Sequence, residues 1–438
     1  MSLKIPRTMV HQLHEVAERL KDEPALWTKR GDSWVATSWR QYAQRVRDFA
    51  LGLQSLGLAP GQAMTVMGFN REEWVVAAVA AMASGGVGVG VYTTASPEQI
   101  AYVTGHCEAT IALVENEGFL ETLLTVRPQL PKLQHIIVMD APTVPREGVL
   151  TFAEVLERGA RANESDYYTR LEALDPMALA QLIYTSGTTG HPKGVMLSHH
   201  NLCWTTVQLS QCHPITIGDT IVSYLPLSHI AEQVCSIYGP LINGLQVYFA
   251  QSFEKLPENL KEVRPTLFLG VPRVWEKFMA KAEAGIATQP RARQRVLAWA
   301  RSVASRFHDD AMSHRQSSIT LQAQYALAKR VVFTPLKARI GLDRAHLLAT
   351  SAAPIAREVL EFFASLDLPI AEIYGQSEVT GPTSVTTLQA MKLGKLGRPM
   401  PGVEVRIADG GEILVKGGNV CMGYYKDEAA TGELLQNG

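Results

Sequence analysis

The residues best suited to chemistry lie in one short stretch, Tyr184-Thr-Ser-Gly-Thr-Thr-Gly-His-Pro-Lys-Gly194, directly after the apolar segment 179–183. Its glycines let the backbone approach a ligand closely, and exposed amides and hydroxyls can surround phosphate oxygens. Lys193 adds a point charge suited to the outer phosphates of a nucleotide. The stretch therefore predicts a loop that binds ATP phosphates. The predicted phosphate contacts are Thr185, Ser186, Gly187, Thr188, Thr189, Gly190 and Lys193.

The spacing of this loop differs from that of the common P-loop, in which Gly-Lys-Ser/Thr opens a helix. Here Lys193 lies three residues after Gly190, follows a proline, and precedes the strand-like residues 195–197. The stretch resembles the signature loop of the adenylate-forming (AMP-forming) superfamily, which includes acyl-CoA synthetases, luciferases and peptide-synthetase adenylation domains. The alternative is a glycine-rich hairpin that binds nothing.

A second motif, Ile373-Tyr-Gly-Gln-Ser-Glu378, follows an apolar strand candidate at 369–373. Tyr374 could stack on a base, Ser377 could bond the α-phosphate, and Glu378 could hold Mg²⁺. The motif resembles the superfamily's Tyr-Gly-x-Thr/Ser-Glu motif, which adds Gly375 and Gln376 to the predicted nucleotide contacts. Without the phosphate loop, a solvated turn would explain Glu378 equally well.

A third motif, Thr350-Ser-Ala-Ala-Pro354, also follows a strand candidate, 346–350. Its small residues let a flat purine lie against the backbone, so Ala352, Ala353 and Pro354 are predicted to contact adenine. The superfamily usually has Gly-Ala-Ala-Pro or Gly-Glu-Pro here, and Ser351 departs mildly from that pattern. Packing alone is the other explanation.

A fourth motif, Ser223-Tyr-Leu-Pro-Leu-Ser-His229, ends a strand and opens a helix. A lone histidine there is often a cap or a core residue. The motif resembles the Pro-Leu-x-His motif of fatty acyl-CoA synthetases, which implies that His229 positions the carboxylate and steadies charge. No Phe-Asp motif for an amino acid substrate follows it. Downstream, Phe268-Leu-Gly-Val-Pro-Arg-Val-Trp275 is compatible with an acyl-tunnel wall that includes Gly270, or with a plain core strand.

Composition and hydrophobic pattern indicate an α/β fold. The 438 residues are too many for one core, and 41 basic against 42 acidic side chains give no argument for nucleic acid as a partner. Short apolar strands alternate with helical stretches, which predicts two packed, mainly parallel sheets flanked by helices. After about residue 384 the alternating strands 403–407 and 411–415 predict a small β-rich, barrel-like subdomain. The other strand candidates are 63–67, 87–91, 110–114, 135–139, 179–184, 219–224, 245–249 and 266–269.

Nothing in the chain reads as a secretory signal, and the five cysteines lack zinc or CxxC spacing, which favours a reducing, cytoplasmic environment. The uncharged run 74–92 is divided by Ser84-Gly85-Gly86, so a buried helix followed by a strand explains it better than a membrane span. Residues 285–339 form a helical, basic region that resembles an insertion of long-chain, including bubblegum-like, acyl-CoA synthetases. Either a solvated face or peripheral contact with an anionic membrane is compatible with it.

The resemblance extends over nearly the whole chain, to Gly417-Gly-Asn-Val-Cys-Met-Gly-Tyr-Tyr-Lys426. It implies the large N-terminal AMP-binding domain of an AMP-forming long-chain fatty acyl-CoA synthetase, made of α/β subdomains within 1–384 and a β-rich subdomain at about 385–438. The family's later Thr-Gly-Asp motif, hinge and mobile lid domain have no counterpart here, so poor turnover is expected. The implied partners are fatty acid, ATP with Mg²⁺, and coenzyme A. The alternatives are an acyl-adenylate-binding fragment without turnover, or an adenylating enzyme for another carboxylate or acceptor.

Overall fold

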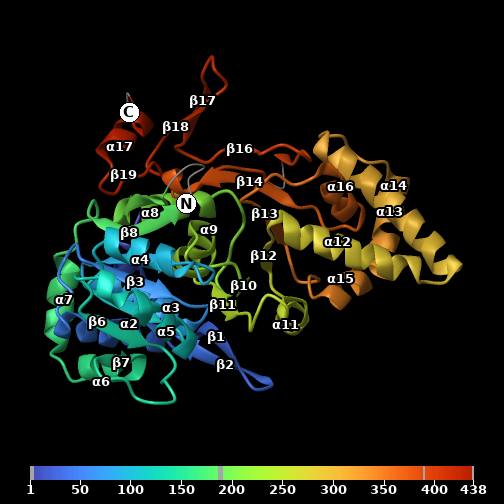
Figure 1. Cartoon of the computed structure of the whole chain (residues 1–438). Coiled ribbons are helices and arrows are strands. Elements are labelled where there is room, and N and C mark those ends of the chain that lie inside the picture. The colour runs from blue at the N-terminus through green and yellow to red at the C-terminus, as the bar shows by residue number, and fades with distance from the viewer. Residues whose placement is uncertain (1–3, 186–190, 388–389, 437–438) are drawn as a thin grey trace.

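The computed structural model describes residues 4–185, 191–387 and 390–436 and has two groups of β-strands covered and separated by helices (Figure 1). Both strands and helices follow the hydrophobic pattern. The predicted strands 63–67 and 87–91 are observed at those residues as β3 (Ala63–Met67) and β4 (Val87–Val91). The other predicted strands are present within a few residues of their expected ends. The predicted α/β class is confirmed.

The first group of strands is an eight-stranded, mostly parallel sheet in the order β19-β9-β8-β4-β3-β5-β6-β7. Its central strands are buried along their whole length, as expected for a parallel sheet covered on both faces. Strands β8 and β9 form an antiparallel hairpin, and β19 pairs with β9. The remaining strands of this sheet are β5 (Ile111–Val114), β6 (His135–Val138), β7 (Val149–Thr151), β8 (Leu179–Thr185), β9 (Lys193–Ser198) and β19 (Gly423–Tyr424).

Helices cover both faces of this sheet. On one face, α4 (Pro97–His106) and α5 (Glu117–Val126) bury their apolar side chains against β3 to β6. On the other face lie α2 (Trp39–Ser55) and α3 (Glu72–Ala83). Helix α3 is buried on nearly all sides, which explains the uncharged run that it shares with β4. Within the described residues, no helix combines the length and apolarity needed to cross a membrane.

The second group consists of a four-stranded sheet, β10-β11-β1-β2, and a five-stranded sheet, β12-β13-β14-β15-β16. The backbone N–H of Thr266 donates to the carbonyl oxygen of Thr220 (3.1 Å), so β10 and β12 lie edge to edge. Strands β10 and β11, and β12 to β14, are parallel. The bounds are β1 (Pro24–Arg30), β2 (Ser33–Ser38), β10 (Thr220–Ser223), β11 (Gln246–Phe249), β12 (Leu267–Leu269), β13 (Leu347–Thr350), β14 (Ala371–Gln376), β15 (Gly381–Val385) and β16 (Arg398–Pro399).

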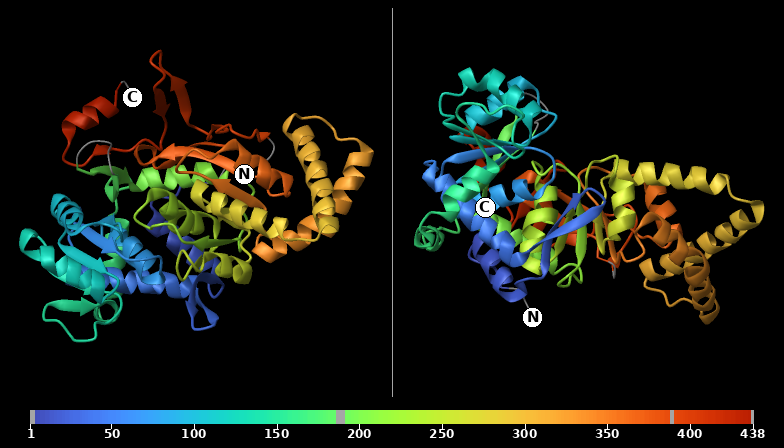
Figure 2. Two further views of the ribbon diagram at one scale, coloured as in Figure 1. Left: turned by 45° about the vertical axis from the view of Figure 1, so that its right-hand side comes forward. Right: turned by 90° about the horizontal axis from the view of Figure 1, so that it is seen from below.

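The helical region predicted at 285–339 is confirmed, and it extends away from the sheets at one end of the molecule (Figure 2). The carboxylate of Asp367 links three helices of this region to the end of α16. Asp367 accepts hydrogen bonds from His308 (3.2 Å), Tyr325 (2.5 Å) and Lys337 (2.7 Å), one from each of three helices. The helices are α12 (Pro272–Ala287), α13 (Arg291–Met312), α14 (Ile319–Ala328), the π-helical turn η3 (Lys329–Phe333), α15 (Thr334–Ile340) and α16 (Arg357–Ser365).

The last part of the chain reaches back to both groups of strands. The hairpin β17 (Glu404–Ile407) and β18 (Ile413–Lys416) corresponds to the predicted strands after residue 384. It forms a two-stranded antiparallel sheet of its own, while β16 and β19 join the two larger groups. The remaining elements are α1 (Met9–Leu20), η1 (Arg127–Gln129), α6 (Phe152–Ala160), α7 (Glu164–Glu172), α8 (His199–Ser210), α9 (Ile230–Gln233), η2 (Val234–Tyr238), α10 (Gly239–Asn243), α11 (Leu256–Val263), η4 (Ser377–Val379) and α17 (Glu428–Leu434).

Candidate active site

A cavity of about 480 Å³ lies against the carboxyl ends of the second group of strands and is the candidate active site. Ligands of α/β folds are held at this edge because strand ends and their loops converge there. Three of the four sequence motifs, together with the last residue of the strand before the phosphate loop, meet on its surface. The predicted site residues that line it are Thr185, His229, Ala352, Gly375, Gln376, Ser377 and Glu378.

Four other predicted nucleotide contacts do not line this cavity. Lys193 is exposed at the start of β9, and Tyr374 is half-buried in β14. Ala353 and Pro354 are exposed in the loop directly after Ala352. The residues Ser186, Gly187, Thr188, Thr189 and Gly190 lie outside the described part of the chain.

Gly270 contributes to the packing behind the cavity and does not line it. Its carbonyl oxygen accepts a hydrogen bond of 2.8 Å from the indole Nε1 of Trp275, and a Cβ there would lie 2.6 Å from that nitrogen. Two residues of the same segment, Phe268 and Leu269, do line the cavity. The part of the predicted segment 268–275 that precedes Gly270 and lines the cavity therefore lies in β12.

The β8–β9 hairpin fixes both ends of the predicted phosphate loop. Thr185 at the end of β8 is paired in register with Lys193 at the start of β9. The Nζ of Lys193 lies 4.8 Å from the ring centroid of Tyr424 and 4.0 Å from a carboxylate oxygen of Asp427. The loop thus begins at the cavity and ends at an exposed ammonium group near the C-terminal segment.

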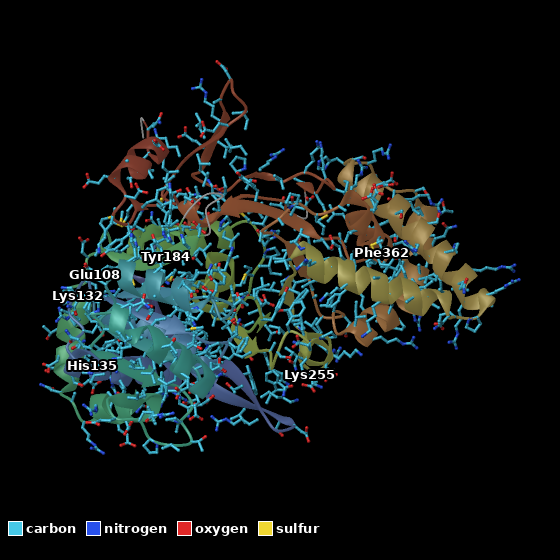
Figure 3. The ribbon with its side chains drawn as sticks, viewed as in Figure 1. Glu108, Lys132, His135, Tyr184, Lys255 and Phe362 are labelled. Carbon is cyan, nitrogen blue, oxygen red and sulfur yellow. The ribbon has the colours of Figure 1, made fainter. Side chains whose placement is uncertain are left out.

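An aromatic stack that was not predicted flanks the same hairpin. His191 stacks on Tyr102 of α4 with 4.4 Å between ring centroids, and Tyr102 in turn stacks on His106 at 5.2 Å. The ring Nδ1 of His106 lies 2.8 Å from the hydroxyl of Tyr184. Figure 3 labels Tyr184 on the opposite side of the molecule from Phe362. The stack packs the loop's C-terminal end against α4. The histidine in the loop was the only signal of this stack in the sequence. Tyr102 and His106 are distant from the loop in sequence, so their contact with it could not be predicted.

Glu378 is placed by an unusually close pairing of strands. A Cβ on Gly375 would lie 1.7 Å from the carbonyl oxygen of Gly381, so only glycine lets β14 and β15 approach and then turn into η4. The Oε1 atom of Glu378 accepts a hydrogen bond of 2.8 Å from the hydroxyl of Tyr424. Burial, and then this carboxylate, raise the pKa of the Tyr424 phenol, which therefore stays a donor.

A magnesium ion would fit beside Glu378. Its half-buried carboxylate lines the cavity, and Tyr424 uses one of its two oxygens. No cluster of three or more metal-ligating side chains occurs in the described residues. That donor set suits Mg²⁺, which usually takes one or two carboxylates and completes its shell with substrate phosphates and water.

Ala352 adopts a backbone conformation that non-glycine residues rarely take. Its φ is +74°, directly after β13 ends at Thr350. A left-handed conformation costs an L-residue roughly 1–2 kcal/mol, so surrounding structure must enforce it. Here it turns the exposed segment 352–354 along the rim of the cavity, where the predicted adenine contacts lie.

His229 caps the short helix α9 and presents one ring nitrogen to the cavity. Its Nδ1 accepts a hydrogen bond of 3.1 Å from the backbone N–H of Ala231, so the proton of the neutral ring lies on Nε2. Burial lowers the pKa of His229, which keeps the imidazole neutral near pH 7. The segment is held close to the first sheet, since a Cβ on Gly90 would lie 2.5 Å from the Cα of Ser228.

One turn beyond His229, the buried carboxyl group of Glu232 ties α9 to the β3–α3 loop. It accepts hydrogen bonds from the hydroxyls of Ser223 (2.7 Å) and Ser236 (2.6 Å), and from Asn70 Nδ2 (3.3 Å). Burial raises the pKa of Glu232 to about 7 even though these bonds lower it. Glu232 and Asn70 were not predicted as site residues. Their role depends on a contact between segments far apart in the sequence.

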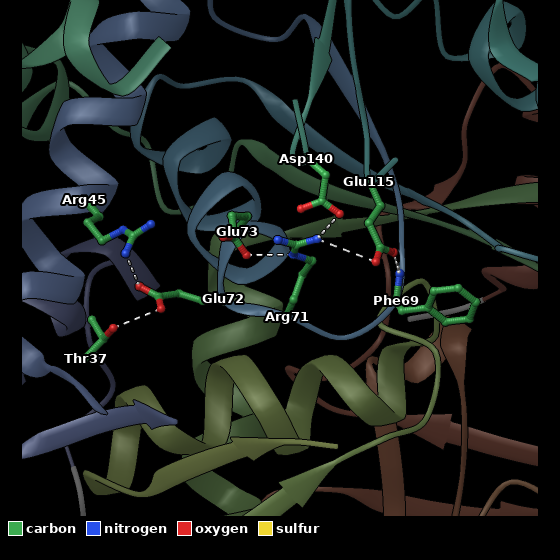
Figure 4. Close-up of polar contacts among 8 residues, drawn as sticks. All are labelled: Thr37, Arg45, Phe69, Arg71, Glu72, Glu73, Glu115 and Asp140. Atoms are coloured by element: carbon green, nitrogen blue, oxygen red, sulfur yellow. Dashed lines mark hydrogen bonds and ion pairs between the residues drawn. The ribbon is translucent and has the colours of Figure 1, made fainter. Parts of the chain in front are cut away.

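The loop that carries Asn70 is itself held by charged groups (Figure 4). Its neighbour Arg71 donates to Glu73 (2.8 Å) and Asp140 (2.9 Å). The backbone N–H of Phe69 donates to Glu115 at 2.6 Å. The carboxyl ends of β3, β5 and β6 thereby fix the loop that positions α9 and His229.

The rest of the cavity is mostly apolar. Away from its polar mouth, its surface is built mainly of aliphatic side chains from β10, β12, β13 and β14 and from the helices α8, α9 and η2. Representative members are Leu209, Ile221, Ile230, Val234, Leu347 and Ile373. Ligand sites commonly combine an apolar wall with a few polar groups that fix orientation.

The sequence profile of one protein family, described as AMP-binding enzyme, matches residues 13–425. The chain belongs to the AMP-binding enzyme family. This AMP-binding enzyme is 39% identical over 447 residues to a long-chain-fatty-acid–CoA ligase, ACSBG2, of Xenopus laevis, over 98% of the chain and 60% of the relative. It is 35% identical over 442 residues to human ACSBG2, over 99% of the chain and 66% of the relative.

The solved structures agree on the fold of this AMP-binding enzyme. A long-chain-fatty-acid-CoA ligase (FadD1) from Archaeoglobus fulgidus superposes with a TM-score of 0.75 at 19% identity, over 99% of this chain and 79% of that one. The resemblance inferred from the motifs is thus confirmed at the level of family and fold. The chain spans less than two thirds of the length of the Xenopus laevis and human relatives.

Proposed function

We propose that the protein activates a fatty acid: ATP and the acid form an acyl-adenylate and pyrophosphate, and coenzyme A then takes the acyl group. The observation that carries this proposal is one cavity whose mouth is lined by Thr185, His229 and Glu378 and whose remainder is mostly apolar. The relatives named as long-chain-fatty-acid–CoA ligases support the same reaction.

The first step needs alignment more than acid–base chemistry, because a carboxylate is already a nucleophile. A carboxylate oxygen attacks the α-phosphorus of ATP, a new P–O bond forms, and the bond to the bridging oxygen of pyrophosphate breaks. The Nε2–H of His229 can donate to the carboxylate or to an α-phosphate oxygen, and the hydroxyl of Ser377 lies on the same wall. Lys193 and the loop between Thr185 and Lys193 would hold the departing phosphates.

Glu378 would hold Mg²⁺, which supplies neutralisation of phosphate charge when bound. The mixed anhydride then has AMP as its leaving group. The thiolate of coenzyme A attacks the acyl carbon, the C–S bond forms, and AMP leaves. The predicted adenine contacts, Ala352, Ala353, Pro354 and Tyr374, remain part of this proposal.

Carboxylate-dependent ATP–pyrophosphate exchange across fatty, aryl and amino acids tests the proposed reaction. We expect exchange with fatty acids, lost in Glu378→Ala and retained in the surface variant Glu412→Gln. Exchange with another class of acid would replace the substrate assignment. Nucleotide binding without exchange for any acid would favour a binding protein without turnover.

We also propose peripheral contact with an anionic membrane through 285–339. Helix α13 carries Arg291, Arg293 and Arg295 together with the exposed apolar side chains of Val296 (47% exposed) and Trp299 (37% exposed). Basic and exposed apolar groups on one helix suit a lipid surface. We expect the protein to float with anionic vesicles, and we expect this binding to weaken with added salt and on substitution of Trp299. If the protein floats with neither anionic nor neutral vesicles, the proposal is wrong.

A further inference from the structure

The cavity extends far from its polar mouth, along the face of the second group of strands. Its lining includes Ser351, just after β13, and Leu347, the first residue of β13. Because parallel strands rise about 3.3 Å per residue, these positions lie roughly 13 Å apart. The cavity therefore runs from the carboxyl ends of the strands to their amino ends.

Polar side chains lie at this deep end. Ser210, His213 and Asn243 all line the cavity beside Ile215 and Leu245, which precede β10 and β11. The Nδ2 of Asn243 donates to the hydroxyl of Ser210 at 2.9 Å, and that hydroxyl donates to the carbonyl oxygen of Thr206 at 2.8 Å. A tunnel that held only an alkyl chain would need no such group.

Of these polar side chains, His213 is buried without a hydrogen-bond partner among the described residues. Its side chain is 6% exposed, and neither Nδ1 nor Nε2 has a hydrogen-bond partner among the described residues. A buried polar group left unpaired costs roughly 1–3 kcal/mol. Burial, with a smaller contribution from His346, lowers the pKa of His213 to about 4, so the ring is neutral and offers one donor and one acceptor.

We propose that this deep end selects an acyl chain that carries a hydroxyl or another hydrogen-bonding oxygen, which His213 binds together with Asn243. The inference rests on the proposed acyl-activating function and adds a substrate class to it. The torsion between Cβ and the imidazole ring is soft, so a small rotation presents a ring nitrogen to the cavity. With C–C bonds of about 1.5 Å, roughly ten bonds of an extended chain span the ~13 Å between the levels of Ser351 and Leu347, the length over which the cavity follows β13.

The test is calorimetry of this chain with non-hydrolysable acyl-adenylate mimics in matched pairs, one with an alkyl chain and one with a single hydroxyl at a varied position. We expect the hydroxyl to strengthen binding at least tenfold when it lies about ten carbons from the carboxyl carbon, and to weaken it near the mouth. His213→Leu should abolish the preference, while Gln211→Leu, an exposed neighbour, should keep it.

Equal affinity for the alkyl and hydroxylated mimics at every position would overturn the inference and leave the proposed function standing. Mimics that bind no better than AMP would overturn both. If His213→Leu does not fold, the positional dependence in the unmodified protein and the loss of preference in Asn243→Leu decide the question. A preference that persists in both variants would also overturn it.

Discussion

At the scale of single residues, the mouth of the cavity places a carboxylate and a neutral imidazole on two elements that meet only in the fold. Glu378 follows β14, and His229 precedes α9. Each has a second contact that fixes its orientation, Tyr424 for the carboxylate and the N–H of Ala231 for the ring. No described residue bonds the second carboxylate oxygen of Glu378 or the Nε2–H of His229, so both groups are left for ligands.

Glu378→Gln tests the metal assignment. The amide keeps the size of the side chain and can still accept from Tyr424, but it loses the charge that attracts Mg²⁺. We expect the Mg²⁺-dependent part of the affinity for ATP to fall roughly tenfold, about 1.4 kcal/mol, with little change in the free energy of unfolding. Titration calorimetry with and without Mg²⁺ measures it. An unchanged response to Mg²⁺, equal to that of Glu412→Gln, would contradict the assignment.

Two substitutions separate the proposed catalytic role of His229 from its structural role as a helix cap. Alanine removes both the Nε2 donor and the helix cap, so we expect acyl-adenylate formation to slow by about 10²–10³ and stability to fall by ~1 kcal/mol. Asparagine can still cap α9, so His229→Asn should recover the stability and leave the reaction slow. Single-turnover rates and urea unfolding measure the two effects. Normal rates in His229→Asn would show that capping is the whole role.

The sequence motifs predicted much of the mouth, because three of the four motifs lie at the ends of β10, β13 and β14 and such strand ends meet at one edge. The site residues that were not predicted come from segments outside the four motifs. Asn70, Tyr102 and Tyr424 reach the site from the β3–α3 loop, α4 and β19, so only the tertiary fold makes them neighbours. The role of Gly270 could not be predicted from the sequence either, because it depends on where the Trp275 indole packs.

At the scale of elements, the carboxylate of Asp367 links three helices of the region 285–339 to the end of α16. Burial alone would raise its pKa, but hydrogen bonds from His308, Lys337 and Tyr325 lower it to about 2. Asp367 also has a φ of +62°, directly after α16 and its cap. The same residue therefore makes a tight turn and anchors α13, α14 and α15.

Removing this anchor should loosen the helices. Asp367→Ala leaves Lys337 without its partner and places alanine in a left-handed conformation, which together should cost about 3–5 kcal/mol locally. Asp367→Asn tolerates the backbone conformation and should have a smaller effect. Hydrogen exchange of 291–328, followed by mass spectrometry, is expected to accelerate while β3 to β6 stay protected. Unchanged exchange in Asp367→Ala would show that packing alone holds the region.

At the scale of the whole molecule, the alternation of apolar strands and helices predicted the two layers of sheet and most strand positions. Strands β1, β2, β7, β15, β16 and β19 were missed. β1 and β2 carry many polar or exposed residues, and β7 is only three residues long and half-buried. Strands of this kind give a weak hydrophobic pattern and form because neighbouring strands supply their hydrogen bonds.

Glu232 should make the stability of the whole protein depend on pH. Its folded pKa of about 7 lies above the ordinary 4.5, so its contribution is fully present below pH 4.5 and is lost as the pH rises through 7. The loss is on the order of 3 kcal/mol. Urea unfolding at about pH 5 and about pH 8 should show this decline in the unmodified protein and a smaller one in Glu232→Gln. Equal declines in both proteins would contradict it.

The affinity of this chain for acyl-adenylate mimics of increasing alkyl length tests most directly whether the cavity holds an acyl group. A polar mouth that opens into a mostly apolar cavity predicts that each added methylene strengthens binding, by up to roughly fourfold for a fully buried group, until the cavity is filled. Filling the cavity by Val234→Trp should abolish that dependence while AMP itself still binds. An affinity that does not change with chain length, or that changes equally in Val234→Trp, would contradict the claim that this cavity holds the acyl group.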